Sequence, residues 1–402
     1  MHPMVKPALR RAWRSLHRIQ FGVTPAHAVV LDPIGPETGA VLGLLDGTRG
    51  TALLRVEARA RGLPDGHLDA LLGRLESAGL LTDATTGRPG KAGPVAGAVD
   101  VALDPLRADL ASLSVVHPEP ERAARTLAAR RSLRVQVRGA GRVGAMVAAL
   151  LAAAGVGTVE VLDSGRVEPW ETAPGGLPAE SVGERRSTAA RRLVGRWARG
   201  PSARPPGAGG GDGRKGTGDP GNPRKRRGPG EGADGARLSL VVVTPRDGLG
   251  AYVPDPLPAE AWLSTGTPHL YAGVLEATGS VGPLVLPGDT ACARCFQEER
   301  TDRDPATPLM LTQWRSGAPH PLPACDLGLS TAVAGLAAAH ALSFLDGDLP
   351  VSAGARWETS LPLLQWRAER WRPHPACPCG AARGGERECA SAVGTGQDTM
   401  AG

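Results

Sequence analysis

Four cysteines occur as two closely spaced pairs in the C-terminal third of the chain. Cys292 and Cys295 form a C-x-x-C pair, and Cys377 and Cys379 form a C-x-C pair much further on. Four thiolates that meet from two such turns make the closed tetrahedral site that structural zinc prefers. The short second pair leaves His374 or Cys389 open as a replacement ligand, and ordinary buried thiols are the alternative.

A glycine-rich turn is the second feature with chemical meaning. Gly139, Gly141 and Gly144 follow the expected strand 133–137 and open a small-residue helix expected to run through 145–154. The first glycine permits a tight turn, the second a close approach to a phosphate, and the third close packing of helix on strand. The start of such a helix offers free N–H groups to an anion.

Asp163 ends the next expected strand, 158–163, and extends this pattern. A carboxylate at that place accepts hydrogen bonds from ribose hydroxyls. Strand, glycine turn, helix, strand and terminal Asp together predict a nucleotide site. The same residues would suit a nicotinamide enzyme, and a glycine turn that only packs its helix is the alternative without a ligand.

The elements that would position these residues alternate between helix and strand. Helical sequence is expected around 105–129, 182–199 and 329–345, and a further strand over 238–243. Strands separated by helices imply a doubly wound parallel sheet, so the predicted fold class is α/β with a Rossmann-like sheet.

The N-terminal part predicts a separate small domain. Extended runs at 19–22 and 28–32 precede three helical patterns near 37–45, 51–60 and 68–78, which suggests a winged-helix-like α+β domain. Such domains bind DNA, peptides or proteins, or serve only for packing. We predict the small domain over 1–83, a linker over 84–98, the Rossmann-like domain over 99–380 with a disordered insertion at 200–237, and a flexible tail over 381–402.

Composition limits the classes of partner. The formal charge of the 402 residues is +6, but the segment 200–237 alone holds eight basic and four acidic residues. The basic balance is therefore weak evidence for nucleic acid. We find neither a signal peptide nor a run of about 18 apolar residues, which predicts a cytoplasmic protein without a membrane span and with cysteines used for thiol or metal chemistry.

Several motifs together resemble the ThiF/MoeB/HesA family, which activates ubiquitin-like proteins. They are the turn 139–144, the segments 151–157 and 161–163, the runs 271–274 and 279–288, and the C-x-x-C pair 292–295. The resemblance implies ATP and Mg²⁺ as cofactors, adenylation of the C-terminal carboxylate of a small ubiquitin-like protein or peptide, a cysteine-bound zinc and a homodimer. On the matching positions it implies nucleotide contacts from Gly139, Gly141, Arg142, Gly144, Asp163 and Arg185, and zinc ligation by Cys292, Cys295, Cys377 and Cys379.

This sequence departs from the family pattern at charged positions. Gly165 stands where a second Asp is usual, and the segment 170–177 lacks the usual phosphate-binding arginine. Arg185 and Arg186 replace a lysine on the next helix. Thr244 replaces the Asp expected after the later strand, with Asp247 nearby. Loss of such groups weakens stabilisation of charge in the transition state.

Two functions therefore follow as hypotheses. The first is an ATP-dependent adenylyltransferase whose activity is weakened or lost, for which we assign no catalytic residue. The alternative is an inactive scaffold that binds a precursor or leader peptide for a partner enzyme. It is similar to the leader-peptide-binding partners of azoline-forming cyclodehydratases, which also join a winged-helix-like domain to a ThiF-like domain. A nicotinamide oxidoreductase fits the glycine turn but not the cysteine pairs. Cys325 is either a sulfur-carrying thiol or a small core residue.

Overall fold

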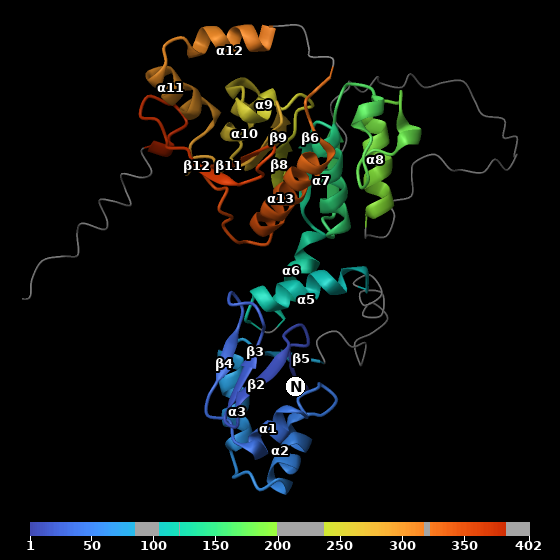
Figure 1. Cartoon of the computed structure of the whole chain (residues 1–402), viewed down its shortest axis with the longest axis vertical. Helices are drawn as coiled ribbons and strands as arrows, with labels where there is room; N and C mark the ends of the chain where they lie inside the picture. Colours follow the sequence, from blue (N-terminus) through green and yellow to red (C-terminus); the bar gives the residue numbers. More distant parts are fainter. Residues whose placement is uncertain (85–103, 120, 199–236, 317–321, 383–402) are drawn as a thin grey trace, which may run out of the picture. The chain divides into compact units, whose positions relative to one another are not determined.

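The computed structural model describes residues 1–84, 104–119, 121–198, 237–316 and 322–382. Its contacts divide the chain into two compact units, Met1–Ser132 with Ala154–Gly157, and Leu133–Ala153 with Thr158–Gly402 (Figure 1). The predicted linker, insertion and tail lie almost entirely outside the described residues.

The first unit holds two small antiparallel sheets and several helices. One sheet has the order β2-β3-β4, and in the other β1 pairs with β5. The strands are β1 (Pro3–Val5), β2 (Arg11–Ser15), β3 (Arg18–Phe21), β4 (Val29–Leu31) and β5 (Leu81–Asp83). The helices are α1 (Pro36–Leu42), α2 (Thr51–Ala60), α3 (His67–Ser77), η1 (Asp104–Leu106), α5 (Arg107–Val116) and α6 (Arg122–Arg130).

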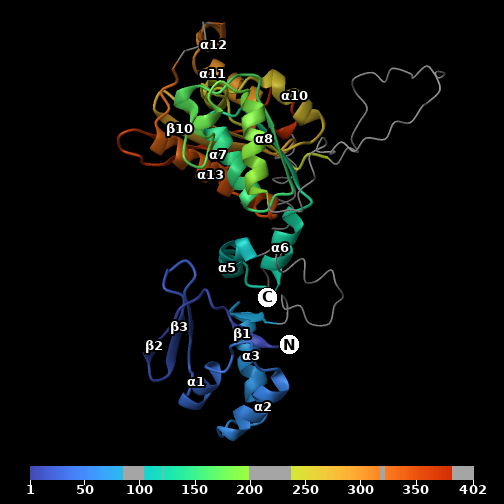
Figure 2. The ribbon, with the colours of Figure 1, turned by 90° about the vertical axis from the view of Figure 1, so that its right-hand side faces the viewer.

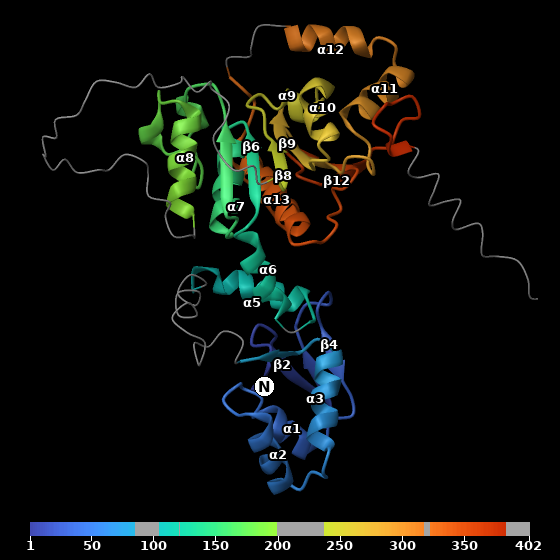
Figure 3. The same cartoon turned by 180° about the vertical axis from the view of Figure 1, so that it is seen from behind.

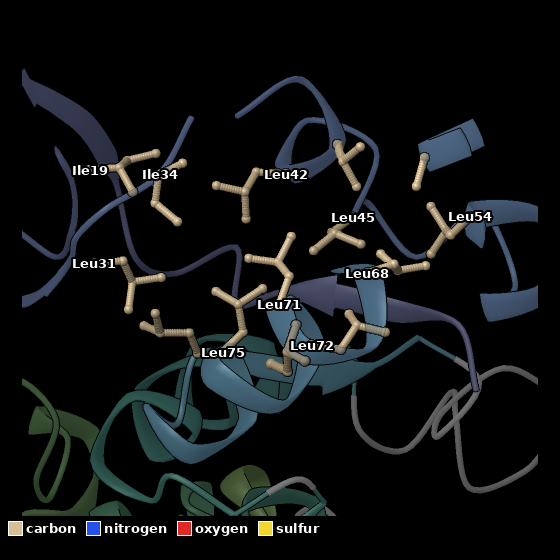
Figure 4. Close-up of a cluster of buried hydrophobic side chains, with 14 of the residues drawn as sticks. Ile19, Leu31, Ile34, Leu42, Leu45, Leu54, Leu68, Leu71, Leu72 and Leu75 are labelled. Carbon is tan, nitrogen blue, oxygen red and sulfur yellow. The ribbon is translucent and has the colours of Figure 1, made fainter. Parts of the chain in front are cut away.

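The two extended runs and three helices expected near the N-terminus are present, and their apolar faces make one core. Figure 4 shows Ile19 and Leu31 from the sheet facing Leu42, Leu71 and Leu75 from α1 and α3. β2 was not predicted because all five of its residues are exposed, which leaves no apolar alternation to detect. β1 and β5 are only three residues long and escape detection for that reason.

The second unit is built on a seven-stranded sheet with the order β12-β11-β10-β9-β8-β6-β7. The strands are β6 (Arg134–Arg138), β7 (Thr158–Leu162), β8 (Leu240–Val243), β9 (His269–Leu275), β10 (Thr278–Val285), β11 (Ala355–Ser360) and β12 (Arg367–Arg370). The neighbours among β7, β6, β8 and β9 are parallel, as predicted, whereas β9 to β12 pair antiparallel. The turn between β9 and β10 consists of Glu276 and Ala277, both with positive φ, which is the geometry of a tight hairpin.

Helices cover both faces of this sheet. They are α7 (Arg142–Ala153), η2 (Pro169–Glu171), η3 (Ala179–Ser181), α8 (Arg186–Trp197), α9 (Leu249–Tyr252), α10 (Pro256–Ser264), α11 (Ala293–Arg303), α12 (Thr307–Ser316) and α13 (Leu327–Leu345). A Cβ on Gly279 would lie 2.6 Å from Val333 of α13, and one on Gly273 would lie 2.9 Å from Ala251 of α9. Gly279 and Gly273 face opposite sides of the sheet, so α13 covers one face and α9 covers the other. α7 and α13 run side by side along one face (Figures 1 and 2). The predicted α/β class with a Rossmann-like sheet is confirmed.

α13 is the one helix in the described ranges that is long and apolar enough to cross a membrane by composition. It packs on α7, β9 and β10 as a core helix, and Val333, Ala337 and Ala341 are buried there. Core helices of this kind pass the same test of composition, so α13 is weak evidence for a membrane span.

Candidate functional site

The glycine turn after β6 has the geometry predicted for it. Gly139 has a φ of +107°, and a Cβ on it would lie 1.9 Å from the carbonyl oxygen of Thr244. A Cβ on Gly144 would lie 2.0 Å from the carbonyl oxygen of Gly139. Both positions therefore require glycine, because β6, α7 and the end of β8 approach each other so closely. At Gly141 the nearest atom would be 3.6 Å away, in Arg246, so packing alone does not require glycine there.

Asp163 lies directly beside this turn, at the carboxyl end of β7. Its Oδ2 accepts a hydrogen bond of 2.9 Å from the backbone N–H of Ala140, and its Oδ1 accepts one of 2.7 Å from Gly165. The sequence-predicted neighbours, glycine turn and Asp163, are thus brought together at one edge of the sheet. Figure 3 shows β6, with α7 following it, from behind.

Arg186, at the start of α8, also reaches Asp163. Its Nε donates to Asp163 Oδ1 at 2.9 Å, and its Nη1 donates to Glu171 Oε1 at 3.0 Å and to the carbonyl of Arg166 at 2.8 Å. Arg246 donates from Nε to Glu171 Oε1 at 2.6 Å. We call these four residues the Asp163 network: Asp163, Glu171, Arg186 and Arg246.

The Asp163 network is balanced in charge, and all of its members except Arg246, at 27% exposed, are largely buried. The side chains of Asp163, Arg186 and Glu171 are only 7%, 11% and 3% exposed. Two carboxylates face two guanidinium groups, so the network adds no net positive charge for a phosphate. A nucleotide that bonded to Asp163 would compete with Arg186, and in this respect the residues present do not fit ATP and Mg²⁺.

Gly165 explains how Arg186 can occupy this place. A Cβ at Gly165 would lie 2.0 Å from Nη2 of Arg186. The guanidinium therefore fills the space that a second Asp at position 165 would take. Sequence reasoning missed Glu171 and Arg246, and the signal that could have led to them was the coincidence of Gly165 with Arg186.

The other positions that the sequence analysis named around this turn do not join the Asp163 network. Arg142 donates from Nη1 to the carbonyl of Cys325 at 2.8 Å. Arg185 is exposed and is the N-cap residue of α8, while its neighbour Arg186 points inward. Thr244 is buried and donates to the carbonyl of Gly139 at 3.0 Å. Asp247 is exposed, and its Oδ1 accepts from the N–H of Leu249 at 3.1 Å.

The two cysteine pairs meet at a second site in the same unit. Sγ of Cys292 lies 3.8 Å from Cys295 and 3.6 Å from Cys377, and Sγ of Cys295 lies 3.5 Å from Cys379. All four sulfur atoms lie within 4.8 Å of one another. Tetrahedral zinc with Zn–S bonds of about 2.3 Å separates its ligands by about 3.8 Å, so the cluster fits one zinc ion.

The thiols of this cluster affect one another's protonation. A hydrogen bond from the Cys292 thiol lowers the pKa of Cys295 to about 4, while that bond and burial raise the pKa of Cys292 itself. Burial raises the pKa of Cys377 to about 12. Without a cation, a thiolate is favoured at Cys295 and the thiol form at Cys292 and Cys377, whereas a divalent ion would favour thiolates.

The alternative ligands are placed differently. Nε2 of His374 lies 2.9 Å from Asp302 Oδ2, and its Nδ1 accepts from the N–H of Ala376. Neither His374 nor Cys325 belongs to the thiol cluster. Cys389 lies outside the described residues.

Comparison with known proteins gives this geometry a context. The model of the ThiF family matches residues 120–200 and 254–379, about half of the chain. A search of curated proteins gave no match. Escherichia coli MccB with ATP superimposes with a TM-score of 0.64 at 13% identity, covering 94% of this chain and 99% of MccB.

Two further solved structures show the same fold. MccB with AMPCPP and MccA has a TM-score of 0.64 at 12% identity and covers 95% of this chain and 100% of its own. PaaA has a TM-score of 0.61 at 15% identity and covers 91% of this chain and 99% of its own. With the family model matched on both sides of the segment 201–253, and with the glycine turn and cysteine pairs in place, the chain belongs to the ThiF family.

Proposed function

We propose that this protein is a peptide-binding scaffold of the ThiF family, which holds a precursor peptide for a partner enzyme and does not adenylate it. The Asp163 network carries the proposal. Adenylation depends on positive charge and metal positioned around the phosphates. Here Arg186 and Arg246 are neutralised by buried carboxylates instead.

The glycine turn supports ATP-dependent adenylation as the second candidate. Gly139 and Gly144 keep the close packing of a nucleotide-binding turn, and MccB, which has the same fold, was solved with ATP. The substrate would then be the C-terminal carboxylate of a small ubiquitin-like protein or peptide. Both candidate functions require a peptide or protein partner, and the structure of MccB with MccA supports such a partner.

Titration calorimetry with ATP and Mg²⁺ separates the two candidates. Because the Asp163 network neutralises its own arginines, we expect no saturable heat for the full chain up to about 1 mM ATP. A Kd of about 1 mM corresponds to a binding free energy of roughly −4 kcal/mol. Saturable micromolar binding that Asp163→Ala abolishes would overturn the scaffold proposal. Pyrophosphate exchange that requires a peptide would establish adenylation.

The peptide would bind at the β4 edge of the three-stranded sheet β2-β3-β4 in the first unit. The N–H of Gly22 donates to the carbonyl of Arg10, so the backbone N–H and C=O groups of alternate residues in this strand point toward β2. The backbone groups of Ile19 and Phe21 therefore point toward β4. Val29 and Leu31 then bond to β3, and the alternation turns the N–H and C=O of Val30 away from it. An exposed edge of this kind accepts an added strand.

α3 borders this edge and gives it a side wall. Arg74 of α3 donates from Nη2 to the carbonyl of Asp32 and from Nη1 to that of Pro33, each at 3.2 Å, and so holds the segment after β4. The side chain of Val30 is accessible, at 41% exposed. A peptide strand on β4 would therefore meet both backbone groups and an apolar side chain.

Val30→Pro tests this edge. Proline removes the outward N–H but no bond to β3, so stability should change little while peptide affinity falls at least about tenfold. We would select peptides from a random display library with the full chain and compare the variants by fluorescence anisotropy. Val30→Ala keeps the N–H and is the matched control. Equal peptide affinity in Val30→Pro and Val30→Ala, with both proteins folded, would exclude strand addition at β4.

A further inference from the structure

A cavity of about 540 Å³ lies in the second unit, apart from the Asp163 network. Its walls come from α9, α11, α12, β11 and β12, and no residue of the glycine turn or of α8 lines it. Its volume is in the range that small-molecule sites occupy. Neither proposed function uses this cavity.

One side of the cavity is aromatic. Phe296 of α11 is buried and stacks on Trp371, with ring centroids 3.8 Å apart. Tyr252 and Trp314 also line the cavity, and Trp314 of α12 is about half exposed. Such rings offer a flat apolar surface to a ring of a ligand.

Most of the charged side chains that line the cavity form ion pairs with one another. Arg356 is buried and pairs with Glu358 and with Glu369, the latter at 2.7 Å, and it also donates to the carbonyl of Tyr252 at 2.6 Å. Glu299 pairs with Arg303 at 2.5 Å. These pairs join three carboxylates to two arginines and leave a net charge of −1.

Two arginines of the lining keep donors to spare. Arg300 lies over the ring of Phe296, 5.1 Å from its centroid, but its buried Nη1 bonds to no acceptor in the described residues. Arg367 on β12 likewise has no carboxylate partner among the residues that the structure describes. The remaining acid, Asp304, is exposed and accepts from the N–H of Ala306. Both guanidinium groups line the cavity, so their accessible N–H groups can donate to an acceptor that a ligand brings.

We propose that this cavity binds an aromatic carboxylate, such as the C-terminal residue of a peptide. The carboxylate would accept from Arg300 and face Arg367, and the ring would lie against the half-exposed Trp314. Recognition of a carboxylate by a guanidinium beside an aromatic surface is charge-assisted and geometrically specific. The proposal does not depend on nucleotide binding or on strand addition at β4.

The test uses the full chain and two small probes, N-acetyl-phenylalanine and its amide, which lacks the negative charge. We expect saturable binding of the acid in titration calorimetry, at least about tenfold tighter than the amide. Arg300→Gln should weaken binding of the acid about tenfold and leave the amide unchanged. Arg294→Gln, on the same helix but paired with Glu260 outside the cavity, is the matched control and should bind like the wild type.

Three results would overturn the proposal. They are no saturable binding of the acid to the wild type, equal affinity for acid and amide, or unchanged affinity in a folded Arg300→Gln. Circular dichroism of each variant checks folding. Leu311→Trp is a second variant that leaves Arg300 intact: Leu311 is buried and lines the cavity, so a bulkier side chain should reduce binding of both probes.

Discussion

Arg186→Met should lower the free energy of unfolding of the second unit by about 3–5 kcal/mol. The substitution removes the only cation that contacts both Asp163 and Glu171 in the described structure. Arg246 can still pair with the Glu171 carboxylate, but the Asp163 carboxylate keeps only backbone N–H donors. A buried carboxylate without its cation is strongly destabilising. Urea unfolding followed by circular dichroism measures the change.

Arg192→Met on the same helix is the control for this prediction. Arg192 pairs with Glu184, and both side chains are well exposed, at 46% and 36%. Exposed pairs contribute about 0–1 kcal/mol, so the two substitutions should differ by at least about 2 kcal/mol. Equal effects would mean that Arg186 is not a structural part of the Asp163 network, and the scaffold proposal would lose its main support.

Removal of zinc should be the second large effect. We expect the purified chain to carry one zinc per molecule at the four-thiol cluster, and Cys295→Ser to lose it. Cys295 is buried at the start of α11, and Cys377 belongs to the C-terminal segment, so the ion would join two distant parts of the chain. Structural zinc contributes directly to folding, so the loss should cost several kcal/mol. Metal analysis and thermal unfolding with and without a chelator measure it.

Cys325→Ser is the matched control, since Cys325 is also partly buried but lies outside the cluster. It should keep its zinc and its melting temperature. Zinc should also dissociate as the pH falls, because protons compete with the metal for the thiolates. Full zinc content in Cys295→Ser would contradict the assignment of the cluster.

Sequence periodicity determined most of the fold of this protein. The apolar spacing of α3, the run that forms β6 and the glycine turn before α7 depend on neighbours along the chain, and these elements are where they were expected. The same local rules failed for β2, whose exposed residues bury no face, and for the antiparallel half of the large sheet. Strand direction there depends on which distant strand becomes the neighbour, and short-range spacing does not contain that information.

The candidate sites divide in the same way. The residue types in the cysteine pairs were enough to predict a metal cluster, because thiolates in closely spaced pairs have few other uses in this setting. Only the tertiary structure placed Cys292 beside Cys377, and only it showed that Arg186 rather than Arg185 turns inward to Asp163. Which of two adjacent arginines faces the interior depends on the rotation of α8 about its axis, and packing against α7 and β7 fixes that rotation. The sequence therefore determined which chemical groups this protein has, and long-range packing decided which of them neutralise one another.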